Sequence, residues 1–223
     1  MKKLIVITMV GAGLLTASCN TKQNFYARVT QKQSVAVKKG EVLTVDTTSS
    51  VIGWKGFHKG GFAPRWGTLN VKSGNVSIQG GQITSGNFII DMTTIKVDPA
   101  SVVEKDKSDD LQTHLKSPDF LDVEKNPVSD FTITNVTDLQ KATIDAVSGA
   151  NKTVSGNLTL LGKIMNITFP AKVEVTDRSI SIHAKFTVNR TDLGIQFGTS
   201  EVDPAQWMIS KDIEITVNVR AIK

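Results

Sequence analysis

The sequence predicts an all-β fold, a single antiparallel barrel of about eight strands with one short helix. Many segments after residue 41 carry apolar residues at every second position, as a strand with one buried face requires. Turn residues separate these segments at hairpin spacing, whereas strand–helix–strand crossovers need longer connections. The chain has 223 residues, and a barrel of about 200 residues commonly forms one domain. Because an open sheet leaves two unpaired edges, we expect closure.

The clearest strands are predicted at residues 86–92, 154–160, 180–188 and 213–219. In the third of these, Phe186 and Val188 fall on the apolar face and polar residues fall on the other. The turns between strands are predicted at residues 73–75, 80–81, 148–151 and 176–178, which are rich in Gly, Asn, Asp and Ser. Together these segments predict an antiparallel meander whose interior is either filled by side chains or holds one elongated apolar ligand.

One short helix is predicted near residues 105–117. Leu111 and Leu115 are four positions apart and therefore share a helix face. Ser108 is expected to cap the helix, with acidic residues following it, and Ser117-Pro118 ends it. The helix is isolated between strands, so it is expected to be an addition to the barrel.

The N-terminus has the layout of a secretory signal, with two lysines, an apolar run and small residues at 16–18. Cys19 follows directly and resembles the lipobox cysteine of bacterial lipoproteins, which is lipidated after cleavage. This resemblance implies a signal peptide at residues 1–18 and a membrane-anchored lipoprotein of the bacterial cell envelope, periplasmic or surface-facing. The alternative is a plain secreted protein with a stray thiol. Residues 19–40 then form the lipidated cysteine and a polar tether, and residues 41–223 form the barrel domain.

Charge and cysteine content restrict the partners. Lys and Arg number 26 against 21 acidic residues, and acids are scattered among the basic positions. A nucleic-acid binder concentrates basic residues on one face with aromatic residues between them, so no nucleic-acid partner is expected. The single cysteine allows neither an intramolecular disulfide nor a cysteine-based zinc cluster.

The search for catalytic and metal-binding motifs finds none. His58, His114 and His183 belong to no His-Glu-x-x-His motif, and no Gly-x-Ser-x-Gly elbow is present. No catalytic residue and no metal ligand is therefore assigned. Two alternatives stay open, namely convergence of the three histidines on zinc and a hydrolytic triad built from distant residues. Asp109 and Asp110 are better explained by the dipole at the start of a helix than by calcium binding.

Residues 114–127 read His-Leu-Lys-Ser-Pro-Asp-Phe-Leu-Asp-Val-Glu-Lys-Asn-Pro, with Phe131 shortly after. This segment resembles the signature loop of the YceI-like family. Further matches follow in the family's order at residues 45–52, 57–59, 154–162 and 189–194, and the resemblance covers about residues 43–222. Leu121 and Leu193 stand where the family usually has aromatic residues, which affects the shape of any channel.

The YceI-like family consists of bacterial periplasmic or secreted lipocalin-like barrels that bind polyisoprenoid lipids. The resemblance implies an eight-stranded lipocalin-like barrel whose interior holds a long isoprenoid chain, such as a quinone tail or a carrier lipid. That lipid is the expected ligand and partner, and no other cofactor is implied. Pairing of two barrels into a homodimer is left open by the sequence.

The functional hypothesis is non-catalytic storage or transport of such a lipid. Two rivals stay open, an envelope lipid-modifying hydrolase and a filled barrel that serves as a stress-response interaction module. Ordinary core packing is the alternative role for every residue expected to contact the lipid. The residues expected to line the lipid channel are Phe88, Ile90, Phe120, Phe131, Leu158, Phe186, Val188 and Val217.

Overall fold

The computed structural model of the chain describes residues 25–103, 107–140, 146–200, 202, 204 and 208–223. Strands dominate this part of the chain. They are β1 (Arg28–Gln31), β2 (Glu41–Val45), β3 (Val51–Gly56), β4 (Arg65–Gln79), β5 (Gln82–Val97), β6 (Val128–Asp138), β7 (Lys152–Leu160), β8 (Lys163–Val175), β9 (Ser179–Asn189) and β10 (Asp212–Ile222). A 3-10 turn, η1 (Pro99–Ser101), and one α-helix, α1 (Ser108–Lys116), follow β5.

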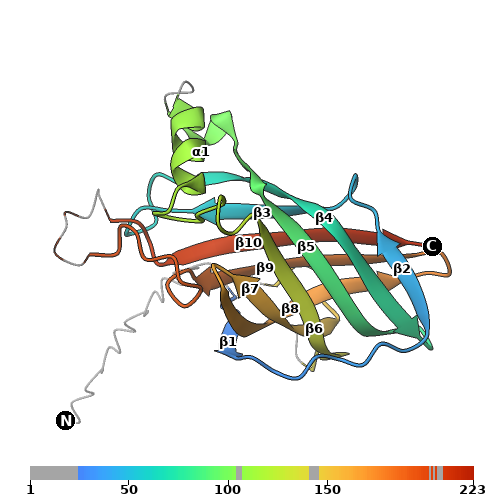
Figure 1. The fold of residues 1–223 in the computed structure, drawn as a ribbon. Coiled ribbons are helices and arrows are strands. Elements are labelled where there is room, and N and C mark those ends of the chain that lie inside the picture. The colour runs from blue at the N-terminus through green and yellow to red at the C-terminus, as the bar shows by residue number, and fades with distance from the viewer. Residues whose placement is uncertain (1–24, 104–106, 141–145, 201, 203, 205–207) are drawn as a thin grey trace, which may run out of the picture.

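The strands close into an antiparallel barrel (Figure 1), as the alternation predicted. Neighbours pair in the order β8-β7-β6-β5-β4, and β9 joins β8 to β10. Both β2 and β3 pair with β4 on one side and with β10 on the other, so together they fill one position in the wall. The barrel wall therefore has eight strand positions. Closure pairs the sheet edges that an open meander would expose.

Helix α1 lies at one end of the barrel, beside the end of β5 (Figure 1). It begins at Ser108, and Lys107 occupies the N-cap position, so the prediction that Ser108 caps the helix is wrong. Ser108 is instead buried as the first helical residue. Among the residues that the structure describes, no helix is long and apolar enough to cross a membrane.

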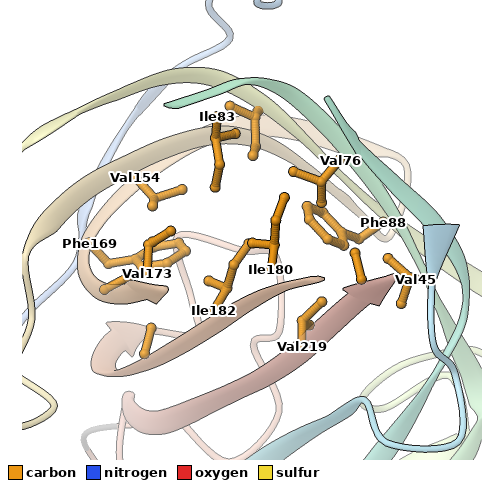
Figure 2. Packing of buried hydrophobic residues seen from close by; sticks show 14 of the residues in the cluster. Val45, Val76, Ile83, Phe88, Val154, Phe169, Val173, Ile180, Ile182 and Val219 are labelled. Carbon is orange, nitrogen blue, oxygen red and sulfur yellow. The ribbon is translucent and has the colours of Figure 1, made fainter. Parts of the chain in front are cut away.

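Apolar side chains from many strands pack together inside the barrel (Figure 2). The most deeply buried of them lie in the half far from α1. This end is formed by β2, the β4–β5 turn, the β8–β9 turn and the end of β10 (Figure 1). The pleat of β8 and β9 directs every second side chain inward, where most are buried. The fully enclosed residues of this half include Leu43, Val76, Ile133 and Ile180.

The chain before β2 packs on the barrel wall and pairs with the edges of β8 and β9. We call residues 25–36 the N-terminal strap. Its strand β1 pairs with the start of β8, and the Ala27 N–H donates to the Thr187 carbonyl of β9 at 2.7 Å. Further along, the Asn157 amide nitrogen donates to the Gln33 carbonyl at 2.7 Å, while the Gln33 N–H donates to the Asn157 side-chain oxygen at 2.9 Å.

The polar composition of residues 19–40 predicted a tether, and the strap departs from this prediction. The reason is that β8 and β9 pair with each other only over residues 171–175 and 180–184, so their remaining lengths offer free edges that β1 and its neighbours occupy. The signal peptide predicted at residues 1–18, the lipidated Cys19 and the first tether residues lie outside the described residues.

Candidate ligand cavity

The half of the barrel near α1 encloses a cavity of about 460 Å³, a volume within the range of small-molecule sites. All eight wall positions supply lining residues, and Leu111 and Leu115 of α1 cover the cavity from the end. The deeply buried residues Leu43, Val76 and Ile180 do not line it, because they pack the far half. The interior is thus filled at one end and hollow at the other.

A row of four phenylalanine rings forms the boundary between the two halves. The centroids of Phe88 and Phe131 lie 6.2 Å apart, those of Phe131 and Phe169 5.9 Å apart, and those of Phe169 and Phe186 4.4 Å apart. The last pair is stacked, with an interplanar angle of 17°. All four rings line the cavity, so the cavity floor is aromatic and offers flat apolar surface to a ligand.

The structure brings together every residue that was expected to line a lipid channel. Each lies on the barrel's inner face, except Phe120, which follows α1 and covers the end. The residues that lie on strands point inward because they alternate with polar residues along the pleat. Contact of these residues with a lipid stays a prediction. The eight are Phe88, Ile90, Phe120, Phe131, Leu158, Phe186, Val188 and Val217.

An aromatic cluster closes part of the α1 end. Three rings contact one another here: the centroid of Phe120 lies 5.0 Å from that of His114 on α1 and 5.1 Å from that of Phe197 in the loop after β9, and the last two lie 4.9 Å apart. His114 Nε2 also lies 2.8 Å from an Asp119 carboxylate oxygen. Sequence reasoning missed the covering role of Leu111, Leu115 and Phe197, although the four-residue spacing of the two leucines already marked an apolar helix face.

Polar lining is sparse and lies mainly toward the same end. Among the described lining residues, the ionisable side chains are those of His58, Arg65 and Arg190. Arg190 is 2% exposed, and its guanidinium donates to the carbonyls of Ser210 at 2.8 Å, Ile195 at 3.1 Å and Ile209 at 3.1 Å. Burial lowers the pKa of Arg190 from its ordinary value. These bonds fasten the loop after β9 to the chain that leads into β10.

The histidines do not converge on a metal or a nucleophile. His183 Nδ1 contacts the Asn218 side chain on the barrel's outer face, while His114 pairs with Asp119 at the surface. Within the described ranges, no group of three His, Cys, Asp or Glu residues is placed to hold a metal ion. Ser129 is the one serine among the described lining residues, and its hydroxyl donates to the Thr159 carbonyl at 2.8 Å. The described residues therefore hold no histidine-activated serine in the cavity.

Known proteins share this barrel. The structure is similar to that of BcnA from Burkholderia cenocepacia, with a TM-score of 0.55 and 15% identity over 79% of this chain and 99% of that one. It is equally similar to a polyisoprenoid binding domain from Saccharophagus degradans implicated in plant cell wall breakdown, with a TM-score of 0.55 and 13% identity over 82% of this chain and 99% of that one. At these identities the similarity shows the fold.

The chain also has relatives in sequence. A UPF0312 protein of Pseudomonas putida is 25% identical over 192 residues, which cover 83% of this chain and 84% of that protein. A UPF0312 protein of Serratia proteamaculans is 31% identical over 140 residues, which cover 60% of this chain and 63% of that protein. Residues 43–221 match the YceI-like domain over nearly the whole barrel. The chain therefore belongs to the YceI-like domain family.

Proposed function

We propose that the protein holds a long apolar lipid, of the polyisoprenoid or quinone-tail type, in its cavity and stores or carries it without changing it chemically. The observation that carries this proposal is a cavity with aliphatic walls, an aromatic floor and a lining that reaches the partly exposed residues Phe57, His58 and Ala63 at the α1 end. The alternative of a filled barrel that acts only as an interaction module does not account for this cavity.

The hydrophobic effect supplies the driving force. Burial of apolar surface contributes about 25 cal/mol per Å², or about 0.8 kcal/mol for each methylene removed from water. A long hydrocarbon chain therefore gains several kcal/mol by entering an apolar cavity, whereas a polar metabolite of the same size loses its hydration. The polyisoprenoid-binding activity stated for the Saccharophagus degradans domain supports the same class of ligand for this chain.

The cell envelope is the proposed location. The layout of residues 1–18 supports export, and Cys19 supports attachment to a membrane through acyl chains. Replacement of Cys19 by Ser is expected to release the protein from the membrane fraction into the soluble fraction. Unchanged sedimentation of Cys19→Ser after a carbonate wash would contradict lipid attachment.

Uptake of a polyprenol by the purified chain tests the proposed function. The informative variant is Leu158→Trp, which adds bulk inside the cavity, and its control is Thr159→Trp, the next residue of β7 and absent from the lining. We expect Leu158→Trp to weaken polyprenol binding by about tenfold or more, equivalent to about 1.4 kcal/mol, and the control to bind as the wild type does. Circular dichroism checks that both variants fold. Failure of the wild type to bind polyprenol or quinone analogues would refute the proposal.

A further inference from the structure

We propose that the bound lipid carries an anionic head group, which lies against Arg190 and Arg65 at the α1 end of the cavity. This inference rests on the proposed function and specifies the chemical class of its ligand. The first observation is the sign of the charge. Within the described part of the chain, the fully charged side chains that line the cavity are these two arginines, and no aspartate or glutamate lines it.

The second observation is the environment of Arg190. Its guanidinium is buried and donates to three carbonyls, all of them uncharged. Burial is the cause that lowers its pKa, and no carboxylate of the described residues forms an ion pair with it. A guanidinium has five N–H donors, and the hydrogen bonds to described residues occupy three of them. A buried cation without a counter-ion is costly, and an anionic ligand group would reduce that cost.

The third observation is that three polar groups come from adjacent segments. Arg65 begins β4 and lies opposite Gly56, two residues before His58. His58 in turn forms an isolated bridge with Ile209, whose carbonyl accepts from Arg190. His58 Nδ1 is buried and has no hydrogen-bond partner. The polar groups of Arg65, His58 and Arg190 therefore lie at one end of an otherwise apolar cavity.

Arginine suits this role because its planar fork binds phosphate and carboxylate groups with two parallel hydrogen bonds. Arg65 uses one of its terminal nitrogens, Nη1, to reach the carbonyls of Pro64 at 3.2 Å and Ser101 at 3.0 Å. No described residue accepts a hydrogen bond from its Nη2, which is left for a ligand. The apolar chain would then extend from the arginines toward the aromatic floor.

The test compares ligands that share one chain and differ at one end. Binding of geranylgeranyl monophosphate, geranylgeranoic acid and geranylgeraniol to the full chain is measured by calorimetry, with inorganic phosphate as a fourth probe. We expect the two anionic lipids to bind at least about tenfold more tightly than the alcohol, and inorganic phosphate to bind far more weakly than either. Equal affinity for the acids and the alcohol would overturn the anionic head group while leaving lipid binding intact. Failure of all three lipids would instead contradict the proposed function.

Variants separate the arginines from general charge effects. Arg65→Gln is expected to weaken binding of the two anionic lipids several-fold more than binding of the alcohol. Lys72→Gln removes the same charge from an exposed site on β4 and is expected to keep the preference. Arg190→Lys keeps the charge but loses the planar guanidinium. The melting temperature of this variant reports any weaker attachment of the loop after β9. An unchanged preference in Arg65→Gln and Arg190→Lys alike would overturn the assignment.

An independent set of contacts points to a second inference, that the α1 end of the barrel docks on a lipid bilayer. The N-terminal strap begins at this end, because the Thr187 N–H donates to the Phe25 carbonyl at 2.6 Å and the Tyr26 hydroxyl donates to Asp212, the first residue of β10, at 2.6 Å. At most six peptide units separate Cys19 from Phe25, a reach of about 20 Å. An anchor at Cys19 would therefore hold this end, with the cavity, toward the membrane.

The same end also exposes large apolar side chains. Phe62 is 46% exposed, Phe197 41% and Ile164 42%. Phe62 lies in the loop between β3 and β4, and Ile164 lies next to the β7–β8 turn. Phe197 packs on Phe120, which follows α1. Exposed apolar residues gathered around a ligand entrance are typical of membrane contact sites. A bilayer also supplies the hydrocarbon from which the proposed ligand would come.

Vesicle flotation tests the docking without the anchor. The Cys19→Ser chain is mixed with vesicles of phosphatidylethanolamine and phosphatidylglycerol in a ratio of about 3:1. We expect the triple change Phe62→Ser, Phe197→Ser and Ile164→Ser to reduce flotation several-fold. The control changes exposed residues of the far end, Val37→Ser, Val42→Ser and Ile222→Ser, and is expected to float as the parent does. Equal flotation of the two triple variants, or none by the parent, would overturn this inference.

Discussion

Gly156 of β7 lies directly beneath the ring of Phe131 on β6. A Cβ atom at position 156 would come closer to the Phe131 ring than van der Waals contact allows. Gly156 pairs with Ile133, two residues along β6 from Phe131. The absence of a side chain on one strand thus makes room for an aromatic ring of its neighbour in the floor of the cavity.

Gly156→Ala is expected to displace this ring and destabilise the barrel. Overpacking of a filled interior costs about 1 to 3 kcal/mol, so urea unfolding should show a loss in this range. Gly56→Ala is the matched control, because a Cβ there meets nothing within 4 Å. Equal stability of Gly156→Ala and the wild type would show that the ring relaxes without cost.

The N-terminal strap is expected to depend on Asn157. This buried amide makes two hydrogen bonds to the backbone of Gln33 and accepts a third from Asn166 at 3.2 Å. Asn157→Leu leaves those strap groups unpaired, which costs about 1 to 3 kcal/mol. Limited proteolysis should cut the strap sooner in this variant. Asn70→Leu, at an exposed position of β4, is the control. Equal cleavage rates in both variants would contradict the role of Asn157.

Asp46, in the turn between β2 and β3, predicts a defined pH dependence. Hydrogen bonds from the Thr48 hydroxyl, the Ser49 hydroxyl and the Thr48 N–H lower the pKa of Asp46 from 3.8 to about 2. A carboxyl group whose pKa is lower in the folded state stabilises the fold above pH 3.8 and loses this contribution as the pH falls toward 2. Asp46→Ala should therefore melt below the wild type at pH 7, and the difference should shrink between pH 4 and pH 2. A difference independent of pH would show that the carboxylate has no such role.

Phe120 is expected to control ligand exchange. It touches the cavity from outside the barrel wall and packs on His114 and Phe197. Phe120→Ala removes the one ring of this cluster that lines the cavity, so the bound lipid should dissociate several-fold faster in stopped-flow displacement. Phe197→Ala opens only the exposed side of the cluster and should have a smaller effect. Identical release rates for wild type and Phe120→Ala would show that exchange follows another route.

Alternation predicted most of this architecture because the pleat of a strand gives every second residue the same environment. Phe186 and Val188 could be placed inside the barrel from this pattern alone. The hollow could not be predicted, since apolar residues at the filled end and at the hollow end alternate alike. Leu43 belongs to the packed core whereas Leu158 lines the cavity, and this difference depends on long-range strand pairing.

The strap was missed for a related reason. Residues 25–36 show no sustained apolar period, although Phe25, Ala27 and Val29 pack against the barrel core. The strap is further attached by backbone pairing with β8 and by the buried amide of Asn157. Such contacts leave little trace in composition. Arg190 falls within the family match at residues 189–194, but its position in the cavity could not be predicted, because a single arginine carries no periodic signal of its own.

Organic extraction of the purified chain, followed by mass spectrometry, tests lipid binding most directly. A chain produced in a bacterial host and purified without detergent is predicted to release a long isoprenoid compound in near-equal molar amount, and Leu158→Trp is predicted to release much less. An empty wild-type protein that also fails to take up quinone or polyprenol analogues would contradict a lipid-carrying role for the cavity.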